Sequence, residues 1–265
     1  MIAKTSAPVT VASLTADLRA LGVTEGGVLI AHVAMSALGW VVGGAQAVVE
    51  ALLAAAGPTG TVVVPTQSGH LSDPALWQAP PVPPEWIEAI RRDMPLFDPA
   101  LTPTRAMGQV VDCFRRHPGA IRSLHPTVSF AACGPLAEAL MVDHALTPGL
   151  GEGSPLSRLY DADAQVLLLG VDHHNDTSLH LAEHRAEWPG KHTYTDGAAL
   201  VIDGVKQWVT YDDLELDDED FAEIGDAFAT TGQERRGAVG DGVGRLCRQR
   251  ALVDFAVAHI SAHRS

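Results

Sequence analysis

The sequence predicts a single α/β domain with a largely parallel central sheet, helices on both faces of this sheet, and an antiparallel hairpin near the C-terminus. Two apolar runs, residues 27–33 and 60–65, enclose a helical pattern over residues 45–56, which is the order of a βαβ unit with parallel strands. A third apolar run, residues 165–169, is short and followed by glycine, as expected for a buried strand. Later in the chain, alternating segments flank Asp203-Gly204, a dipeptide typical of tight hairpin turns.

The remaining elements follow from helix caps and hydrophobic periodicity. A helix over residues 10–21 begins at the capping side chain of Thr10, and Gly22 ends it. Further expected elements are a strand over residues 127–132 and helices over residues 108–116, 134–142, 154–160, 177–188 and 240–263. We assign them to one domain, residues 1–265, which is long enough to bury a full core.

Composition argues against several classes of partner. The net charge of −14 disfavours nucleic acids and anionic membranes, which attract cationic surfaces, and it permits a cationic ligand. No uninterrupted apolar run is long enough to span a bilayer, and residues 1–6 lack the apolar core of a signal peptide. Cys113, Cys133 and Cys247 form neither a zinc pattern nor a disulfide framework. We expect reduced thiols in a cytoplasmic protein that is a monomer or a homodimer.

Residues 73–103 contain eight of the seventeen prolines of the chain. Strand patterns with similar loop chemistry lie on both sides of this segment. We therefore expect a long ordered excursion over the active face rather than a linker between domains. A surface loop without a role in function is the alternative.

The segment of residues 170–183 carries the strongest functional signal. It follows the predicted strand of residues 165–169, and ligands of α/β proteins bind where such strands end. Its polar part can cap the helix that follows, through Asn175 or Asp176. On that helix His180 and Glu183 share one face, and histidine is suited to proton transfer near neutral pH.

The same helix supports a second interpretation. His180-Leu181-Ala182-Glu183-His184 fits the inverted zinc-peptidase motif, in which two histidines bind the metal and the glutamate is the general base. A zinc-dependent hydrolase is therefore an alternative function. His180 and Glu183 could also be an ordinary exposed pair on a helix.

Three other segments carry polar groups suited to ligands. Residues 36–44 join a strand to a helix, where free backbone N–H groups favour phosphate or carbonyl oxygens, although glycine there also serves tight turns. Within residues 122–130, Arg122 could hold a phosphate, or the hydroxyl groups could cap neighbouring backbone. Residues 211–220 include seven acids, which either form a solvated charge block or attract a polycation. A polycation-binding protein without turnover is thus a third interpretation.

Taken together, five blocks resemble the aminoglycoside 3-N-acetyltransferase family, whose fold is unrelated to the common GNAT acetyltransferases. Their order and spacing carry the resemblance more than any single block does. The blocks are residues 26–32 with Ser36, Leu38-Gly39 and Gly43-Gly44; residues 57–65; residues 122–126 with 129–132; residues 151–155; and residues 166–170 with 177–183.

The resemblance implies transfer of an acetyl group from acetyl-CoA to the 3-amino group of a cationic aminoglycoside, an activity that confers antibiotic resistance. It implies direct transfer with His180 as general base, oriented by Glu183 or by Asp213 or Glu215, and it requires no metal. The acetyl-CoA site is expected at Ser36, Leu38, Gly39, Val41, Val42, Arg122, Ser123, His125, Ser129 and Phe130. The aminoglycoside site is expected at Asp73, Asp213 and Glu215.

Overall fold

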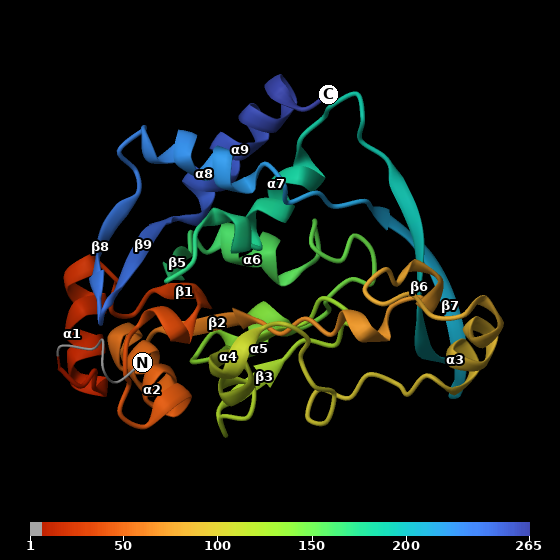
Figure 1. Cartoon of the computed structure of the whole chain (residues 1–265), viewed down its shortest axis with the longest axis horizontal. Coiled ribbons are helices and arrows are strands. Elements are labelled where there is room, and N and C mark those ends of the chain that lie inside the picture. The colour runs from red at the N-terminus through yellow and green to blue at the C-terminus, as the bar shows by residue number, and fades with distance from the viewer. Residues whose placement is uncertain (1–6) are drawn as a thin grey trace.

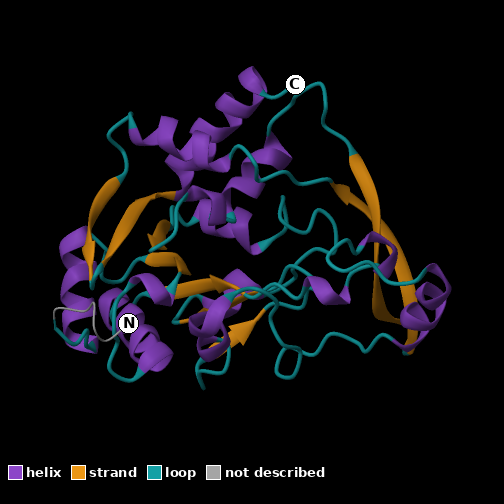
Figure 2. Cartoon of the chain, in the orientation of Figure 1, coloured by secondary structure: helices purple, strands orange, loops and turns teal. Residues whose placement is uncertain are grey.

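The computed structural model describes residues 7–265, so residues 1–6, where we expect no signal peptide, lie outside the described part. A central sheet carries helices on both faces, and a long hairpin stands apart from it (Figures 1 and 2). The predicted α/β class, the helices on both faces and the antiparallel hairpin are confirmed.

The central sheet has the strand order β3-β4-β2-β1-β5-β9-β8. The strands are β1 (Val28–Val33), β2 (Thr61–Pro65), β3 (Ala120–Arg122), β4 (Phe130–Cys133), β5 (Gln165–Leu169), β8 (Arg235–Val239) and β9 (Gly242–Arg248). Strand β1 pairs in parallel with β2 and β5, and every other pair of the sheet is antiparallel. The parallel arrangement thus holds at the centre of the sheet and not at its two sides, because β8 and β9 form a hairpin and β4 runs back beside β2.

Both faces of the central strands are buried, which explains why their sequences are continuously apolar. Leu29 and Ala31 of β1 lie in one core, with α1 (Val11–Leu21), α2 (Gly44–Ala56) and α4 (Gly108–Phe114). Val28 and Ile30 lie in the other core. The helices of that second core are α5 (Ala137–Met141), α6 (Pro155–Asp161), α7 (Ser178–Arg185), α8 (Phe221–Ala229) and α9 (Gln249–His263).

Local sequence signals place most of these elements correctly. Thr10 caps α1 by accepting a hydrogen bond from the Ser13 N–H at 3.1 Å, and Gly22 ends the helix in a left-handed conformation. The predicted helix of residues 177–188 ends earlier, at Arg185. The prediction of a continuous helix over residues 240–263 is wrong, because its first part is β9, which pairs with β5.

The predicted hairpin is formed by β6 (Thr193–Ile202) and β7 (Val205–Leu214), and it is longer than its sequence signal. Asp203 and Gly204 both adopt positive φ, at 52° and 78°, as a type I′ turn requires. This hairpin does not pair with the central sheet. It extends along one end of the molecule (Figure 1).

The proline-rich excursion packs against this hairpin and is mostly loop (Figure 2). The N–H of Asp73 donates to Oδ1 of Asp196 on β6 at 2.9 Å. Leu71, Met94 and Ala199 form a small separate core beside α3 (Ile87–Asp93). The excursion is therefore tied to the hairpin as part of the domain, whereas its expected position over the active face stays a prediction.

The three cysteines are free thiols. In the part of the chain that the structure describes, no helix combines the length and apolar character needed to cross a membrane.

Candidate active site

Helix α7 presents the main candidate residues at the end of β5. The chain leaves β5 through Gly170, which has a φ of 66°, and reaches α7 through the 3-10 helix η6 (His173–Asn175). The N-cap of α7 is Thr177 and not Asn175 or Asp176, the two predicted caps. Asp176 lies one residue earlier, and its Oδ1 accepts a hydrogen bond from the Ser178 N–H at 3.0 Å.

His180 and Glu183 form a hydrogen-bonded pair on α7. Nδ1 of His180 lies 2.6 Å from Oε2 of Glu183, whose side chain is fully buried. Oε1 of the same carboxylate accepts from Nη1 of Arg264 at 2.6 Å and from the Asp217 N–H at 2.9 Å. Nδ1 of His180 donates its proton to the carboxylate of Glu183. The lone pair of the neutral ring is therefore on Nε2, which can take a proton.

His180 lies in a cavity of about 370 Å³ at the ends of β1, β2 and β5. His32, Gln67, Asn175, Asp176 and Asp218 are among the residues that line it. The side chain of His180 keeps 16% of its surface exposed, so it is accessible from this cavity while its partner Glu183 is not.

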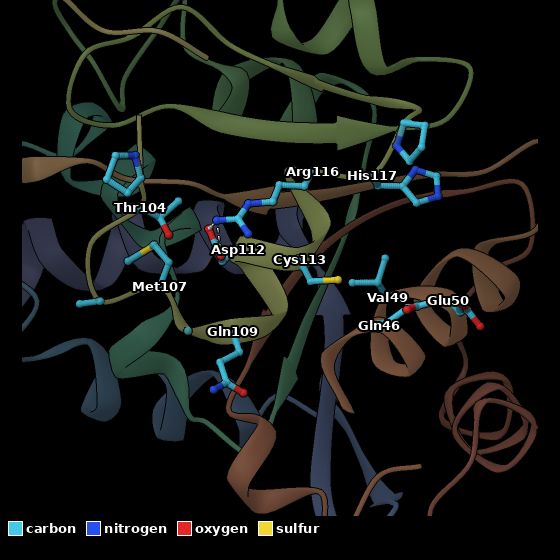
Figure 3. A pocket seen from close by; sticks show the side chains of 14 residues that line it. Gln46, Val49, Glu50, Thr104, Met107, Gln109, Asp112, Cys113, Arg116 and His117 are labelled. Atoms are coloured by element: carbon cyan, nitrogen blue, oxygen red, sulfur yellow. Dashed lines mark hydrogen bonds and ion pairs between the residues drawn. The ribbon is translucent and has the colours of Figure 1, made fainter. Parts of the chain in front are cut away.

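Two further cavities adjoin this one. The larger has a volume of about 860 Å³ and shares residues 106–108 with the His180 cavity. It lies between α2 and α4, with Gln46 and Glu50 from α2 and Gln109 and Cys113 from α4 (Figure 3). We call it the α2–α4 cavity.

The third cavity, of about 500 Å³, shares Asp218 with the His180 cavity. Four acidic residues and Arg264 line it, and we call it the acidic cavity. The acidic residues are Glu215, Asp217, Asp218 and Glu219. His192 also lines it, and its Nε2 lies 2.6 Å from Glu215. The pKa of His192 is raised, first by its hydrogen bond to the Gly190 carbonyl and then by Glu215.

A row of buried charged groups extends behind the His180 cavity. Oδ2 of Asp176 lies 3.1 Å from Nδ1 of His173, and Nε2 of His173 lies 2.6 Å from Glu234. Burial alone would lower the pKa of His173, but its hydrogen bonds to Asp176 and Glu234 outweigh burial and raise the pKa to about 9. His173 is therefore a buried imidazolium held between two carboxylates.

His32 begins this row at the cavity. Its Nε2 is buried, lies 3.8 Å from Oδ1 of Asp176 and has no hydrogen-bond partner within residues 7–265. Burial lowers the pKa of His32 more than Asp176 raises it. His32 is thus a neutral ring that contributes to the cavity wall.

Comparison with known proteins identifies the family of this chain. The sequence matches the model of the aminoglycoside 3-N-acetyltransferase family over residues 30–261. The chain belongs to this family. The family expected from the sequence is therefore confirmed, and the chain is an acetyltransferase.

Among its relatives is the SPbeta prophage-derived aminoglycoside N(3')-acetyltransferase-like protein YokD of Bacillus subtilis (strain 168). It is 42% identical over 257 residues, which cover 97% of this chain and 94% of YokD. The crystal structure of YokD matches with a TM-score of 0.96 and 41% identity, over 99% of this chain and 97% of that chain.

Ligands are present in several of the similar solved structures, of which two represent the two expected substrate classes. AAC-IIIb, a binary complex with CoASH, matches with a TM-score of 0.87 and 33% identity, over 97% of each chain. A histidine-to-alanine variant of AAC(3)-IVa, in complex with a gentamicin, matches with a TM-score of 0.82 and 34% identity, over 98% of this chain and 91% of that chain.

Five residues expected at the acetyl-CoA site of this acetyltransferase lie in the loop between β1 and α2. They are Ser36, Leu38, Gly39, Val41 and Val42. Leu38 and Val41 are buried, and the Leu38 carbonyl accepts from the Asp241 N–H at 3.1 Å, so the loop packs against the β8–β9 turn. None of the five lines the three cavities described above.

Arg122 belongs to a buried network. Its guanidinium donates five hydrogen bonds inside the protein, to Thr66, Pro99, Thr102 and Ser129. Burial lowers its pKa to about 10. Because this guanidinium joins β2, β3 and the proline-rich excursion, the geometry favours a structural role for Arg122 over a direct contact with a phosphate.

Ser123, His125 and Phe130 also lie in this buried region. Oγ of Ser123 accepts from the Phe130 N–H at 2.9 Å and contacts Nδ1 of His144 at the same distance. Burial lowers the pKa of His125 to about 4 and that of His144 to about 3. These hydrogen bonds match the alternative interpretation of residues 122–130, in which hydroxyl groups cap neighbouring backbone.

The three carboxylates expected at the aminoglycoside site lie in different environments. Asp73 is buried and bound by Arg91 through both oxygens, at 3.1 and 2.7 Å. Asp213 accepts from the Gly149 and Leu214 N–H groups at 2.9 and 2.8 Å, and within residues 7–265 it forms no hydrogen bond or ion pair with His180. Only Glu215 lines one of the three cavities.

The zinc-peptidase interpretation of His180-x-x-Glu183-His184 does not fit this geometry. Glu183, the expected general base of that motif, is held by His180 and Arg264 and is fully buried. Within residues 7–265 no group of three or more histidine, cysteine, aspartate or glutamate side chains is placed to hold a metal ion.

Sequence reasoning missed Arg264, Glu234 and Asp218 as parts of the site. No local pattern marks the first two, since each meets its partner through the fold. Asp218 belongs to the acidic run of residues 211–220, but the sequence does not distinguish it from the other acids. In the structure it lines both the His180 cavity and the acidic cavity.

Proposed function

We propose that this enzyme transfers the acetyl group of acetyl-CoA to the 3-amino group of an aminoglycoside, with His180 as general base. The observation that carries the proposal is the His180–Glu183 pair, which faces a cavity between two others. The complexes of AAC-IIIb with CoASH and of the AAC(3)-IVa variant with a gentamicin support both substrate classes.

His180 solves the main chemical problem of this reaction. A protonated amine has no lone pair, so it cannot attack a thioester until a base removes a proton. Nε2 of His180 takes that proton, and the carboxylate of Glu183 stabilises the resulting imidazolium through Nδ1. The burial of Glu183 strengthens this interaction, because water does not compete for its oxygens.

The transfer then proceeds directly between the two substrates. The amine nitrogen bonds to the thioester carbon, and the carbon–sulfur bond breaks as the tetrahedral adduct collapses. The proton on Nε2 of His180 passes to the departing thiolate, and the second proton that the ammonium nitrogen loses in becoming an amide leaves to solvent. The products are the N-acetylated aminoglycoside and free CoA thiol, and neither a covalent enzyme intermediate nor a metal is needed.

The two outer cavities suit the two substrates. The α2–α4 cavity is large and meets the His180 cavity at residues 106–108, which fits a long co-substrate with its thioester at one end. The acidic cavity has the charge that a polycationic aminoglycoside requires. An acceptor amine extending past Asp218 reaches His180, so the reaction would take place between the two binding regions.

A thiol-release assay with acetyl-CoA and a panel of aminoglycosides tests this function. We expect CoA release that depends on the aminoglycoside, together with a mass increase of one acetyl group in the antibiotic. Binding of aminoglycosides without CoA release would instead identify a polycation-binding protein. Activity that disappears with a chelator and returns with stoichiometric zinc would favour the hydrolase interpretation.

A further inference from the structure

We propose that Arg264 is a positioning residue of this active site, which acts on His180 through Glu183. This inference rests on the proposed role of His180. Arg264 directly follows α9 and is 81 residues from Glu183 in sequence, yet its Nη1 lies 2.6 Å from Oε1 of Glu183. The order Arg264, Glu183, His180 thus runs from the end of α9 into the cavity.

Arg264 is itself held in one orientation. Its Nε and Nη2 donate to the two carboxylate oxygens of Asp220, at 3.0 and 2.6 Å. Nη2 also donates to the Asp217 carbonyl at 2.7 Å, and the guanidinium carbon lies 5.2 Å from the centre of the Trp188 ring. Only 10% of the side chain is exposed. A planar guanidinium with this many fixed contacts is a rigid donor rather than a mobile surface charge.

The contact between Arg264 and Glu183 determines which oxygen of Glu183 forms the hydrogen bond with His180. The last torsion of a glutamate side chain is soft, so an isolated carboxylate rotates easily. Here Oε1 is held by Arg264 and by the Asp217 N–H, which leaves Oε2 for Nδ1 of His180. The orientation of the imidazole therefore depends on both ends of the carboxylate.

Arg264 also supplies the positive charge that pairs with Glu183. Glu183 is fully buried, and Arg264 is the one arginine or lysine within residues 7–265 that forms an ion pair with it. A buried carboxylate that loses its cation changes its hydrogen-bond partners, since an unpaired buried charge is costly. Without Arg264, Oε2 of Glu183 would no longer be held toward Nδ1 of His180, and the carboxylate would orient the imidazole less well.

The experiment compares Arg264→Gln and Arg264→Lys with Arg185→Gln. Arg185 lies on α7 like His180, but it pairs with the exposed Glu152 on the surface, so it controls for loss of a positive charge near this helix. We expect Arg264→Gln to lower kcat about 10- to 100-fold, the loss seen when the hydrogen-bond partners of metal-bound histidines are removed, because those partners also act by orienting an imidazole. The KM for acetyl-CoA should change less than about two-fold. The KM for the aminoglycoside should not rise, because Arg264 also lines the acidic cavity and its loss removes a positive charge there. Arg264→Lys should restore part of kcat, because a lysine keeps the charge beside Glu183.

A second readout is the Nδ1 proton of His180 in ¹H NMR spectra. A hydrogen bond of 2.6 Å to a carboxylate gives a far-downfield resonance. We expect this resonance in the native protein and in Arg185→Gln, and not in Arg264→Gln or Glu183→Gln. Because NMR needs no turnover, it tests Arg264 even if the protein acetylates no aminoglycoside.

A kcat of Arg264→Gln equal to that of Arg185→Gln would overturn the inference, as would retention of the downfield resonance. An increase in KM with kcat retained would show that Arg264 belongs to the binding surface instead. If Arg264→Gln does not fold, Arg264→Lys decides, because a positioning role predicts a shifted or broadened resonance and a role in stability alone predicts an unchanged one.

Discussion

Oε2 of Glu183 lies 2.6 Å from Nδ1 of His180, whereas both oxygens of Asp213 are bound by backbone N–H groups of Gly149 and Leu214. Sequence alone left these two carboxylates, together with Glu215, as candidates for the role of orienting the base. The contacts place Glu183 beside the imidazole. Asp213 instead links the end of β7 to the loop at Gly149.

Replacement of His180 should remove the base. We expect His180→Ala to lower turnover by on the order of 10² to 10⁴, the usual contribution of general base catalysis. The matched control is His184→Ala on the same helix, which should lose far less. Thiol release under saturating substrates measures both. A loss of only a few-fold for His180→Ala would mean that the base is elsewhere, and equal losses for the two variants would favour the zinc motif.

Replacement of the two rival carboxylates should separate their roles. Glu183→Gln keeps the size of the side chain but removes the charge that stabilises the imidazolium. We expect its kcat to fall by on the order of 10² or more, as for other carboxylates that orient a catalytic histidine. Asp213→Asn should lower the melting temperature and affect kcat much less. The opposite ranking of the two kcat values would make Asp213 the partner of His180.

Neutralising the acidic cavity should weaken aminoglycoside binding. Glu215 is exposed, so we expect Glu215→Gln to raise the KM for the aminoglycoside by roughly 1.5- to 5-fold, the range for one exposed charge pair. The KM for acetyl-CoA should not change, and the difference from the native enzyme should shrink at high salt. Glu152→Gln, a charge change outside the three cavities, is the control. An unaltered aminoglycoside KM in Glu215→Gln would remove Glu215 from the binding wall.

The buried imidazolium of His173 should make stability depend on pH. Its pKa is raised from the ordinary 6.5 to about 9, so the folded state keeps a proton that the unfolded state loses between these values. This contribution is complete below about pH 6.5 and disappears as the pH rises through 9. Burial would raise the pKa of Asp176 and Glu234, but His173 keeps both lowered, so their contribution disappears on acidification.

Thermal unfolding of the native protein and His173→Gln checks this pH dependence. The difference between their melting temperatures should be largest near pH 6.5 and should decline between pH 6.5 and about 9. Glu234→Gln provides the same comparison if His173→Gln does not fold. Two melting curves that stay parallel across this interval would show that His173 is not charged in the folded state.

Local sequence patterns correctly predicted those elements and contacts that depend on residues close together in the sequence. β5 was expected at residues 165–169 and is found there, and the three-residue spacing of His180 and Glu183 brings them together on one turn of α7. Residues 242–248 carry no comparable local signal, and their pairing with β5 makes them a strand instead of part of a helix.

Contacts between distant segments explain what the sequence could not predict. Arg122 was expected to be free to bind a phosphate, because no residue near it in sequence is an evident partner for its guanidinium. In the structure Thr66, 56 residues away, accepts its hydrogen bonds within the core. Glu234 and Arg264 reach His173 and Glu183 across 61 and 81 residues. Only the packing of the sheet and helices brings these charges together.

The arrangement of the cavities has a consequence for the order of substrate addition. The α2–α4 cavity and the acidic cavity meet the His180 cavity through different residues, 106–108 and Asp218. With acetyl-CoA in the α2–α4 cavity and the aminoglycoside in the acidic cavity, as we propose, neither substrate has to pass through the region of the other. We therefore expect that either substrate can arrive first and either product can depart first. Initial-rate plots should therefore intersect rather than run parallel, with CoA competing against acetyl-CoA and not against the antibiotic.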